Sequence, residues 1–146
     1  MALRGTVWVP TAFTMKAYSE RLEPDTPETF VARKTYDHQL GQIGAAFKAG
    51  VALATGTDAG SLGVHHGAAL REEIFVLMEA GLPLEKAIRS ATFEGARLLG
   101  FEREMGSLVK GMSATFAVVP GSPERLPFSL KGPVVTYVFG ELVNVG

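Results

Sequence analysis

The stretch GVALATGTDAGSLGVHHG, from Gly50 to Gly67, decides how the rest of the sequence is interpreted. It opens with a continuous apolar run, Val51–Thr55, as expected of a strand that is covered on both faces. A second run, Gly5–Pro10, is β-branched and aromatic, ends at a proline and also predicts a buried strand. The apolar spacing from about Thr29 to Gly50 predicts a helix. The two strands should therefore lie side by side and parallel.

Further helices are expected after this unit. One is predicted over about Ala68–Ala80, one from about Pro83, and a shorter one over about Glu94–Leu99. The segment TAFTMKAYSERLEPDTPE has two prolines and mixed polarity, which predicts a long loop with at most one short helical turn. Alternation of strands and helices indicates a parallel α/β architecture.

The character of the sequence changes near residues 103–106. The run GSLVKGMSATFAVV predicts a hairpin around Lys110-Gly111, and PVVTYVFGELVNVG predicts a second hairpin that turns at Gly140. A proline-rich connection, PGSPERLP, lies between them. We therefore divide the chain into an α/β part, residues 1–103, and a small β part, residues 104–146.

Composition excludes several classes of protein. The chain has 146 residues, of which 47% are hydrophobic and 20% charged, as in a globular domain rather than a disordered chain. A net charge of −1 without a basic cluster argues against nucleic acid and membrane surfaces as partners. The sequence shows no signal peptide or membrane-spanning run, and it has no cysteine for disulfides or thiolate ligands. We expect a cytoplasmic protein.

Asp58 is the first candidate for chemistry, because it follows a predicted parallel strand at the end where such folds carry functional residues. A carboxylate there can bind a cation and take a proton from water. The alternative is structural: an aspartate after a strand commonly forms an Asx-turn or caps the next helix.

A resemblance adds to this reasoning. AGVALATGTDAG, then VHHGAALREEIFVLMEAGLPLEKAIRSATFEGARLLG, then GSLVKGMSATFAVV together resemble the C-terminal portion of the metal-dependent amidohydrolases, in the imidazolonepropionase and Xaa-Pro dipeptidase (prolidase) branch. The resemblance implies an α/β fold in which GTVWVPT and VALATGTDAG are strands 7 and 8 of a (β/α)8 TIM-like barrel, each with its following helices. The final hairpins would be part of a small β-sandwich. It covers nearly all of this chain but only the last third or so of a typical family member.

For the site, the resemblance implies that Asp58 is both a metal ligand and the general base that activates the attacking water. His66 corresponds to the histidine of the family's Pro-His-Gly segment, which implies a substrate contact; a loop histidine that bonds backbone is the alternative. His65 is expected at the surface, and His38 is expected to have a surface or packing role and not to bind a metal. We interpret three charged residues at the start of the following helix as structural or rim residues: Arg71, Glu72 and Glu73.

The family's remaining ligands, a His-x-His pair, a lysine and two further histidines, have no counterpart in this sequence. One carboxylate cannot hold a catalytic zinc, so we expect a fragment of a longer enzyme, or a short product that pairs with a complementary chain. The chain alone should be inactive. The expected cofactor is a divalent metal, zinc first, as one or two ions; the expected partners are a small amide substrate, the missing part of the barrel and a second copy in a homo-oligomer. The alternative function is a non-catalytic association module, an orphan half-barrel that binds a complementary chain or self-assembles.

Overall fold

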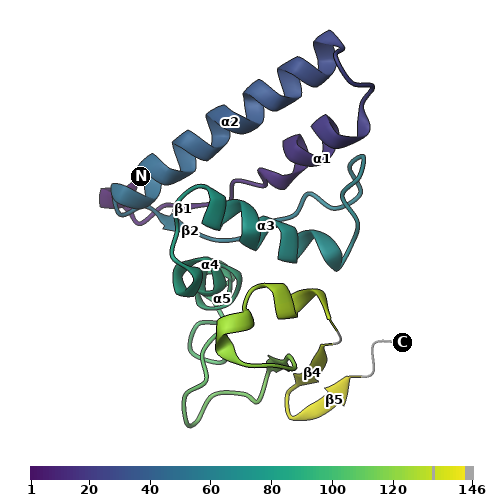
Figure 1. Ribbon diagram of the computed structural model, residues 1–146. Helices are drawn as coiled ribbons and strands as arrows, with labels where there is room; N and C mark the ends of the chain where they lie inside the picture. Colours follow the sequence, from purple (N-terminus) through teal and green to yellow (C-terminus); the bar gives the residue numbers. More distant parts are fainter. Residues whose placement is uncertain (133, 144–146) are drawn as a thin grey trace.

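The computed structural model of the chain describes residues 1–132 and 134–143. Helices and short strands alternate in the first part of the sequence, and a strand-containing part follows (Figure 1). The α-helices are α1 (Phe13–Arg21), α2 (Pro27–Lys48), α3 (Ala68–Glu79), α4 (Leu84–Ala91) and α5 (Phe93–Leu98). The strands are β1 (Val7–Trp8), β2 (Ala52–Leu53), β3 (Phe116–Val118), β4 (Val135–Val138) and β5 (Glu141–Val143). Short 3-10 helices are η1 (Ala2–Arg4), η2 (Pro123–Arg125) and η3 (Phe128–Lys131).

Strands β1 and β2 form a parallel pair in which Val7 lies opposite Ala52 and Trp8 opposite Leu53. The chain between them forms α1 and α2, so the predicted strand–helix–strand unit is confirmed. Hydrogen bonding continues beyond the strands, because the Ala54 N–H donates to the Trp8 carbonyl at 3.0 Å. The carboxyl ends of both strands therefore lie side by side.

Gly56 allows the two chains to stay close beyond the strands. A Cβ at Gly56 would overlap Val9 Cγ1 and lie 3.1 Å from Thr11 Cγ2. Both of these side chains belong to the segment that leaves β1. The absence of a side chain at Gly56 is thus what lets the segment leading to Asp58 rest against the segment leaving β1.

The prediction of a long loop after β1 is wrong. Residues Phe13–Arg21 form the nine-residue helix α1, and its buried residues are the small side chains of Thr14 and Ala17. A helix that buries small and polar residues shows no apolar stripe, which is why its periodicity was not visible in the sequence. The prolines that suggested a loop, Pro24 and Pro27, lie after α1 and at the start of α2.

Helix α2 matches its prediction and has clear end signals. The Thr26 side chain accepts a hydrogen bond from the Thr29 N–H at 3.3 Å, Pro27 occupies the first turn, and Gly50 follows the helix with a φ of 74°. It has 22 residues, yet no helix within the described part of the chain is long and apolar enough to cross a membrane.

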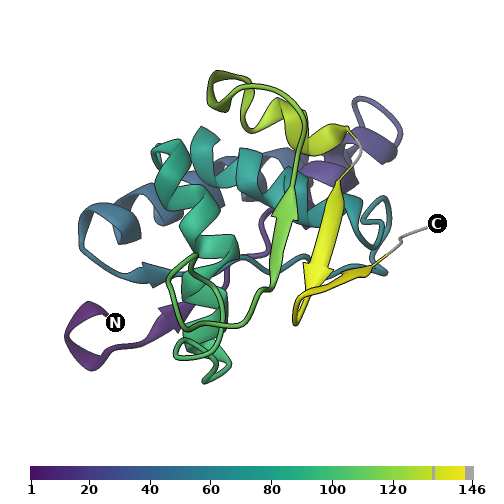
Figure 2. The same cartoon turned by 90° about the horizontal axis from the view of Figure 1, so that it is seen from below.

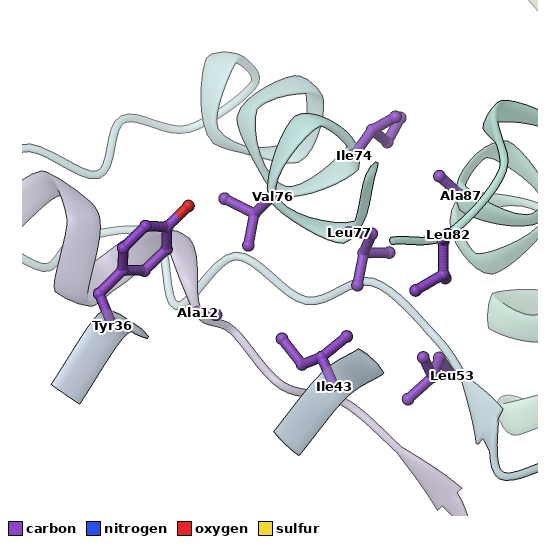
Figure 3. Close-up of a cluster of buried hydrophobic side chains, with 9 residues drawn as sticks. All are labelled: Ala12, Tyr36, Ile43, Leu53, Ile74, Val76, Leu77, Leu82 and Ala87. Atoms are coloured by element: carbon purple, nitrogen blue, oxygen red, sulfur yellow. The ribbon is translucent and has the colours of Figure 1, made fainter. Parts of the chain in front are cut away.

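The core lies between α2, α3 and the strands. Figure 3 shows Ile43 of α2 pointing toward α3, with Leu77 and Leu53 close to it. Ile43 and Leu77 are completely buried, and Leu53 of β2 is 4% exposed. The cluster as a whole comprises Ala12, Tyr36, Ile43, Leu53, Ile74, Val76, Leu77, Leu82 and Ala87. This cluster packs β2, the strand that leads to Asp58, against α2 and α3.

The three helices after β2 agree with the predictions within about two residues, the usual uncertainty of helix ends. Gly81 follows α3 with a φ of 97°, Pro83 precedes α4, and Gly100 follows α5 with a φ of 80°. These are the stop and start signals on which the predictions rested.

The last part of the chain forms a second sheet with the order β3-β4-β5, drawn in green to yellow in Figure 2. The predicted hairpin at Gly140 is confirmed, because β4 and β5 pair antiparallel with Val138 opposite Glu141. The hairpin around Lys110-Gly111 is wrong: β3 pairs with β4 instead. The chain does turn there, with the Met112 N–H donating to the Val109 carbonyl at 3.1 Å, but Leu108 before the turn is 85% exposed and forms no strand.

A short segment after β3 packs on α3. Arg71 donates to the Leu130 carbonyl at 2.9 Å, and the rings of Phe75 and Phe128 lie 5.4 Å apart. The boundary that we place between residues 103 and 104 falls in the irregular segment between α5 and β3, and it stays a prediction.

Candidate functional site

Asp58 lies in the loop that leaves β2, on the segment that Gly56 holds against the end of β1. Its φ is 50°, a left-handed conformation that aspartate tolerates better than most residues. The side chain is exposed, and Ser61 Oγ donates to Asp58 Oδ2 at 3.0 Å. The Ser61 N–H donates to the Asp58 carbonyl at 3.3 Å, so the main chain makes a turn here.

Asp58 forms neither the Asx-turn nor the helix cap that the structural alternative requires, within the described residues. The side-chain-to-backbone bond that an Asx-turn would need is made by the neighbour: Thr57 Oγ1 accepts from the Ala59 N–H at 3.3 Å. Within residues 1–132 and 134–143, no backbone N–H donates to the Asp58 carboxylate. Helix α3 begins later, with Gly67 at its N-cap. The carboxylate is therefore available for another role, and its assignment as ligand and base stays a prediction.

The turn at the end of β1 is the second component of the site. Thr11 has a φ of 48°, which is unusual for a β-branched residue, and its side chain lies against Gly56. The next two backbone N–H groups, those of Ala12 and Phe13, donate to Glu73 Oε1 and Oε2 at 3.0 Å and 2.8 Å. Glu73 comes from α3 and is completely buried.

For Glu73, the sequence alone left open whether the residue is structural or lies at a rim. It is structural and does not lie at a rim. Burial raises the pKa of the Glu73 carboxyl group, and the two backbone donors lower it in part. Its signal in the sequence is its position: Glu73 falls on the buried face of α3 together with Ala69, Val76 and Leu77, where glutamate is rare unless it has partners.

Both histidines after the Asp58 loop are exposed. Their backbone carbonyls accept from the first turn of α3: Ala68 N–H donates to His66 and Ala69 N–H to His65, each at 3.0 Å. His65 also lines an open hollow between α1 and α3, whereas His66 does not. The expected exposure of His65 is confirmed, and His38 is exposed on α2, which agrees with a surface role. The role of His66 stays a prediction.

The described part of the chain does not supply a complete set of metal ligands. Among the residues that the structure describes, no group of three or more His, Cys, Asp or Glu side chains could hold an ion. Structural and catalytic zinc sites take three or four protein ligands. The exposed Asp58 carboxylate is chemically suited to be one of them.

Comparisons with known proteins agree with the fold described above. No individually curated protein sequence gives a significant match. Among solved structures, a Xaa-Pro dipeptidase with bound methionine superposes with a TM-score of 0.81 and 33% identity, over 98% of this chain and 36% of that one. A Bifidobacterium longum protein provisionally described as a prolidase gives a TM-score of 0.78 and 27% identity, over 94% of this chain and 35% of that one.

The chain therefore spans about a third of the length of these two structures. The family model of the amidohydrolases matches residues 32–143, which include Asp58, His66 and all of α3 to β5. The chain belongs to the amidohydrolase family, and it provides part of that family's TIM-barrel-type fold.

Proposed function

We propose that this chain is the C-terminal part of a metal-dependent hydrolase that cleaves an amide-type C–N bond. Dipeptide-like, acylamino and cyclic amide substrates are the candidates. The observation that carries the proposal is the position of Asp58, an exposed carboxylate without a structural hydrogen bond to the backbone, at the carboxyl end of one of two parallel strands. Membership of the amidohydrolase family supports the class of reaction.

Asp58 would serve as a metal ligand and as the general base. Asp58 and ligands from outside this chain would hold a divalent cation, zinc first, which would lower the pKa of a bound water. The Asp58 carboxylate would accept a proton from the attacking water as the new C–O bond forms, and would then return it to the leaving nitrogen as the C–N bond breaks. Ser61, which donates to Asp58 Oδ2, would hold the carboxylate in one orientation.

In this proposal β1 and β2 are the seventh and eighth strands of the barrel, and β3–β5 are part of a β-sandwich. The remaining strands and ligands come from sequence outside this chain or from a complementary chain. We further propose a cytoplasmic location, on composition alone, and a homo-oligomer. The competing function, a non-catalytic association module, is favoured only by the short two-stranded sheet that β1 and β2 form within the described residues.

The experiment is a substrate and metal survey of the full-length protein. Three substrate sets are compared: Xaa-Pro dipeptides, N-acyl amino acids and cyclic amides such as hydantoins. We expect hydrolysis of at least one set, loss of activity on chelation and recovery on adding zinc or manganese. Turnover that persists in metal-free protein would contradict metal dependence, and no hydrolysis of any set by metal-loaded protein would contradict the proposed reaction.

The 146-residue chain alone should bind zinc weakly and hydrolyse none of these substrates. Asp58 is its proposed ligand, and one carboxylate gives far less affinity than three or four ligands. The measurement is metal content after dialysis, with the full-length protein as the reference. Tight binding of one zinc per isolated chain would reveal a ligand set that we have missed.

His66→Ala in the full-length enzyme should raise KM and leave kcat nearly unchanged. Loss of one hydrogen bond to substrate weakens binding by about 2- to 10-fold, the range that corresponds to 0.5–1.5 kcal/mol. His38→Ala, an exposed histidine on α2, is the matched control and should change neither constant. A fall in kcat with KM unchanged would assign His66 to the chemical step instead.

A further inference from the structure

Glu73 is a buried acid that the proposed reaction does not use. It lies on α3 with no exposed surface, although glutamate is almost never fully buried without partners. Its partners are two backbone N–H groups from a segment about 60 residues earlier, Ala12 at 3.0 Å and Phe13 at 2.8 Å. The carboxylate therefore fixes main chain and not another side chain.

The two N–H groups belong to the start of α1. Ala12 is the N-cap residue and Phe13 the first residue of the helix, and the N–H groups at these two positions have no acceptor within the helix. Glu73 supplies the missing acceptor from α3. The positive end of the α1 dipole also favours the ionised form of the Glu73 carboxyl group, which opposes the effect of burial.

This cap lies directly beside the turn at the end of β1. Thr11, in its left-handed conformation, stands between the buried Pro10 and the capped Ala12. The Thr11 side chain touches the position that a Cβ on Gly56 would fill, and the chain reaches Asp58 two residues later. A continuous series of contacts thus runs from Glu73 through the turn to the segment that carries the Asp58 carboxylate.

We propose that Glu73 is a positioning residue for catalysis: it fixes the turn after β1, against which the Gly56–Asp58 segment rests, and so sets the place of the Asp58 carboxylate. The inference rests on the proposed role of Asp58. A carboxylate that must reach both a metal and a water tolerates little displacement, since a shift of about 1 Å at a reacting group can reduce the rate on the order of 100-fold.

The test uses the full-length enzyme with two matched variants, Glu73→Gln and Glu79→Gln. Both residues are glutamates of α3 that bond to the α1–α2 region. Glu79 accepts from Lys16 of α1 at 3.1 Å and from the Tyr36 hydroxyl of α2 at 2.7 Å. It therefore also links α3 to α1, but it makes no hydrogen bond to the turn after β1. Glutamine at 73 keeps the size of the side chain but offers one acceptor where two N–H groups need one each.

We expect Glu73→Gln to lower kcat by on the order of 10-fold or more at a temperature where circular dichroism shows it folded, with KM little changed. Glu79→Gln should keep the wild-type kcat even if its melting temperature falls. Should Glu73→Gln not fold, Glu73→Asp, which keeps the charge but shortens the reach, carries the same expectation.

Wild-type kcat in a folded Glu73 variant would overturn the positioning role and leave the hydrolase proposal intact. An equal loss of kcat in Glu79→Gln would also overturn it, because the effect would then follow from helix packing in general. If the wild-type enzyme itself hydrolyses none of the three substrate sets, the proposed function fails first, and the positioning role fails with it.

Discussion

Asp58→Asn in the full-length enzyme should abolish amide hydrolysis while the protein remains folded. The amide cannot take the proton of the attacking water and is a poorer metal ligand than a carboxylate. Removal of a general base alone lowers kcat by about 10²- to 10⁴-fold. Asparagine keeps the shape of the side chain, tolerates the φ of 50° and can still accept from Ser61 Oγ, so the thermal melt should move little. Steady-state kinetics beside thermal melts measure both quantities.

The chain offers a matched control in Asp25. It is an exposed aspartate with a φ of 61°, in the connection between α1 and α2. A mere turn residue at position 58 would tolerate asparagine as well as Asp25 does, because asparagine suits left-handed turns. We expect Asp25→Asn to keep wild-type turnover. Near wild-type kcat in both variants would mean that Asp58 is a turn residue and neither ligand nor base.

The sequence predicts the central unit of the fold because its signals are local. Val51–Thr55 is apolar on both faces, glycines stand on either side of it, and the α2 region has a threonine cap, a proline in its first turn and a glycine after its end. Such features depend on neighbouring residues only. The parallel pairing of Trp8 with Leu53 then follows from how a strand–helix–strand unit packs.

Helix α1 could not be predicted for the opposite reason. Its N-cap residue is Ala12, which gives no capping signal, and the acceptor for its first N–H groups is Glu73, far away in the sequence. Its buried residues, Thr14 and Ala17, are small. Both the cap and the packing of this helix depend on residues that are distant in the sequence, so no local sequence pattern predicts them.

The error at Lys110-Gly111 has a similar physical origin. A glycine with a φ of 98° and a turn are present, and two β-rich runs flank them. A hairpin also needs cross-strand partners, and Phe116 finds its partner in Tyr137, with the two rings stacked at 4.9 Å. The turn is visible in the sequence, whereas the choice between two apolar partners is not.

The candidate site divides in the same way. Asp58 could be located from the strand before it, and the role proposed for it comes from the resemblance to the amidohydrolases. The link between Glu73 and the turn after β1 exists only in three dimensions. The other ligands of the proposed metal could not be predicted, because one carboxylate does not specify its partners.

Ile43→Ala should cause a large loss of stability with little effect on the chemical step. Ile43 is completely buried between α2 and α3, in the cluster that also holds Leu53 of β2 (Figure 3). Truncation removes apolar contacts and leaves a cavity, which lowers the free energy of unfolding by about 2–5 kcal/mol for isoleucine to alanine. Chemical denaturation of the full-length protein measures the change.

Val31→Ala on the same helix is the control, since valine is also β-branched and its side chain is 61% exposed. Its effect should stay within about 0.5 kcal/mol. Equal losses for the two variants would contradict the placement of Ile43 in the core. Ile43 touches no reacting group, so the folded fraction of Ile43→Ala should keep a nearly normal kcat. Asp58→Asn should do the reverse. This opposite pair of outcomes separates a residue of the core from the residue that we propose for catalysis.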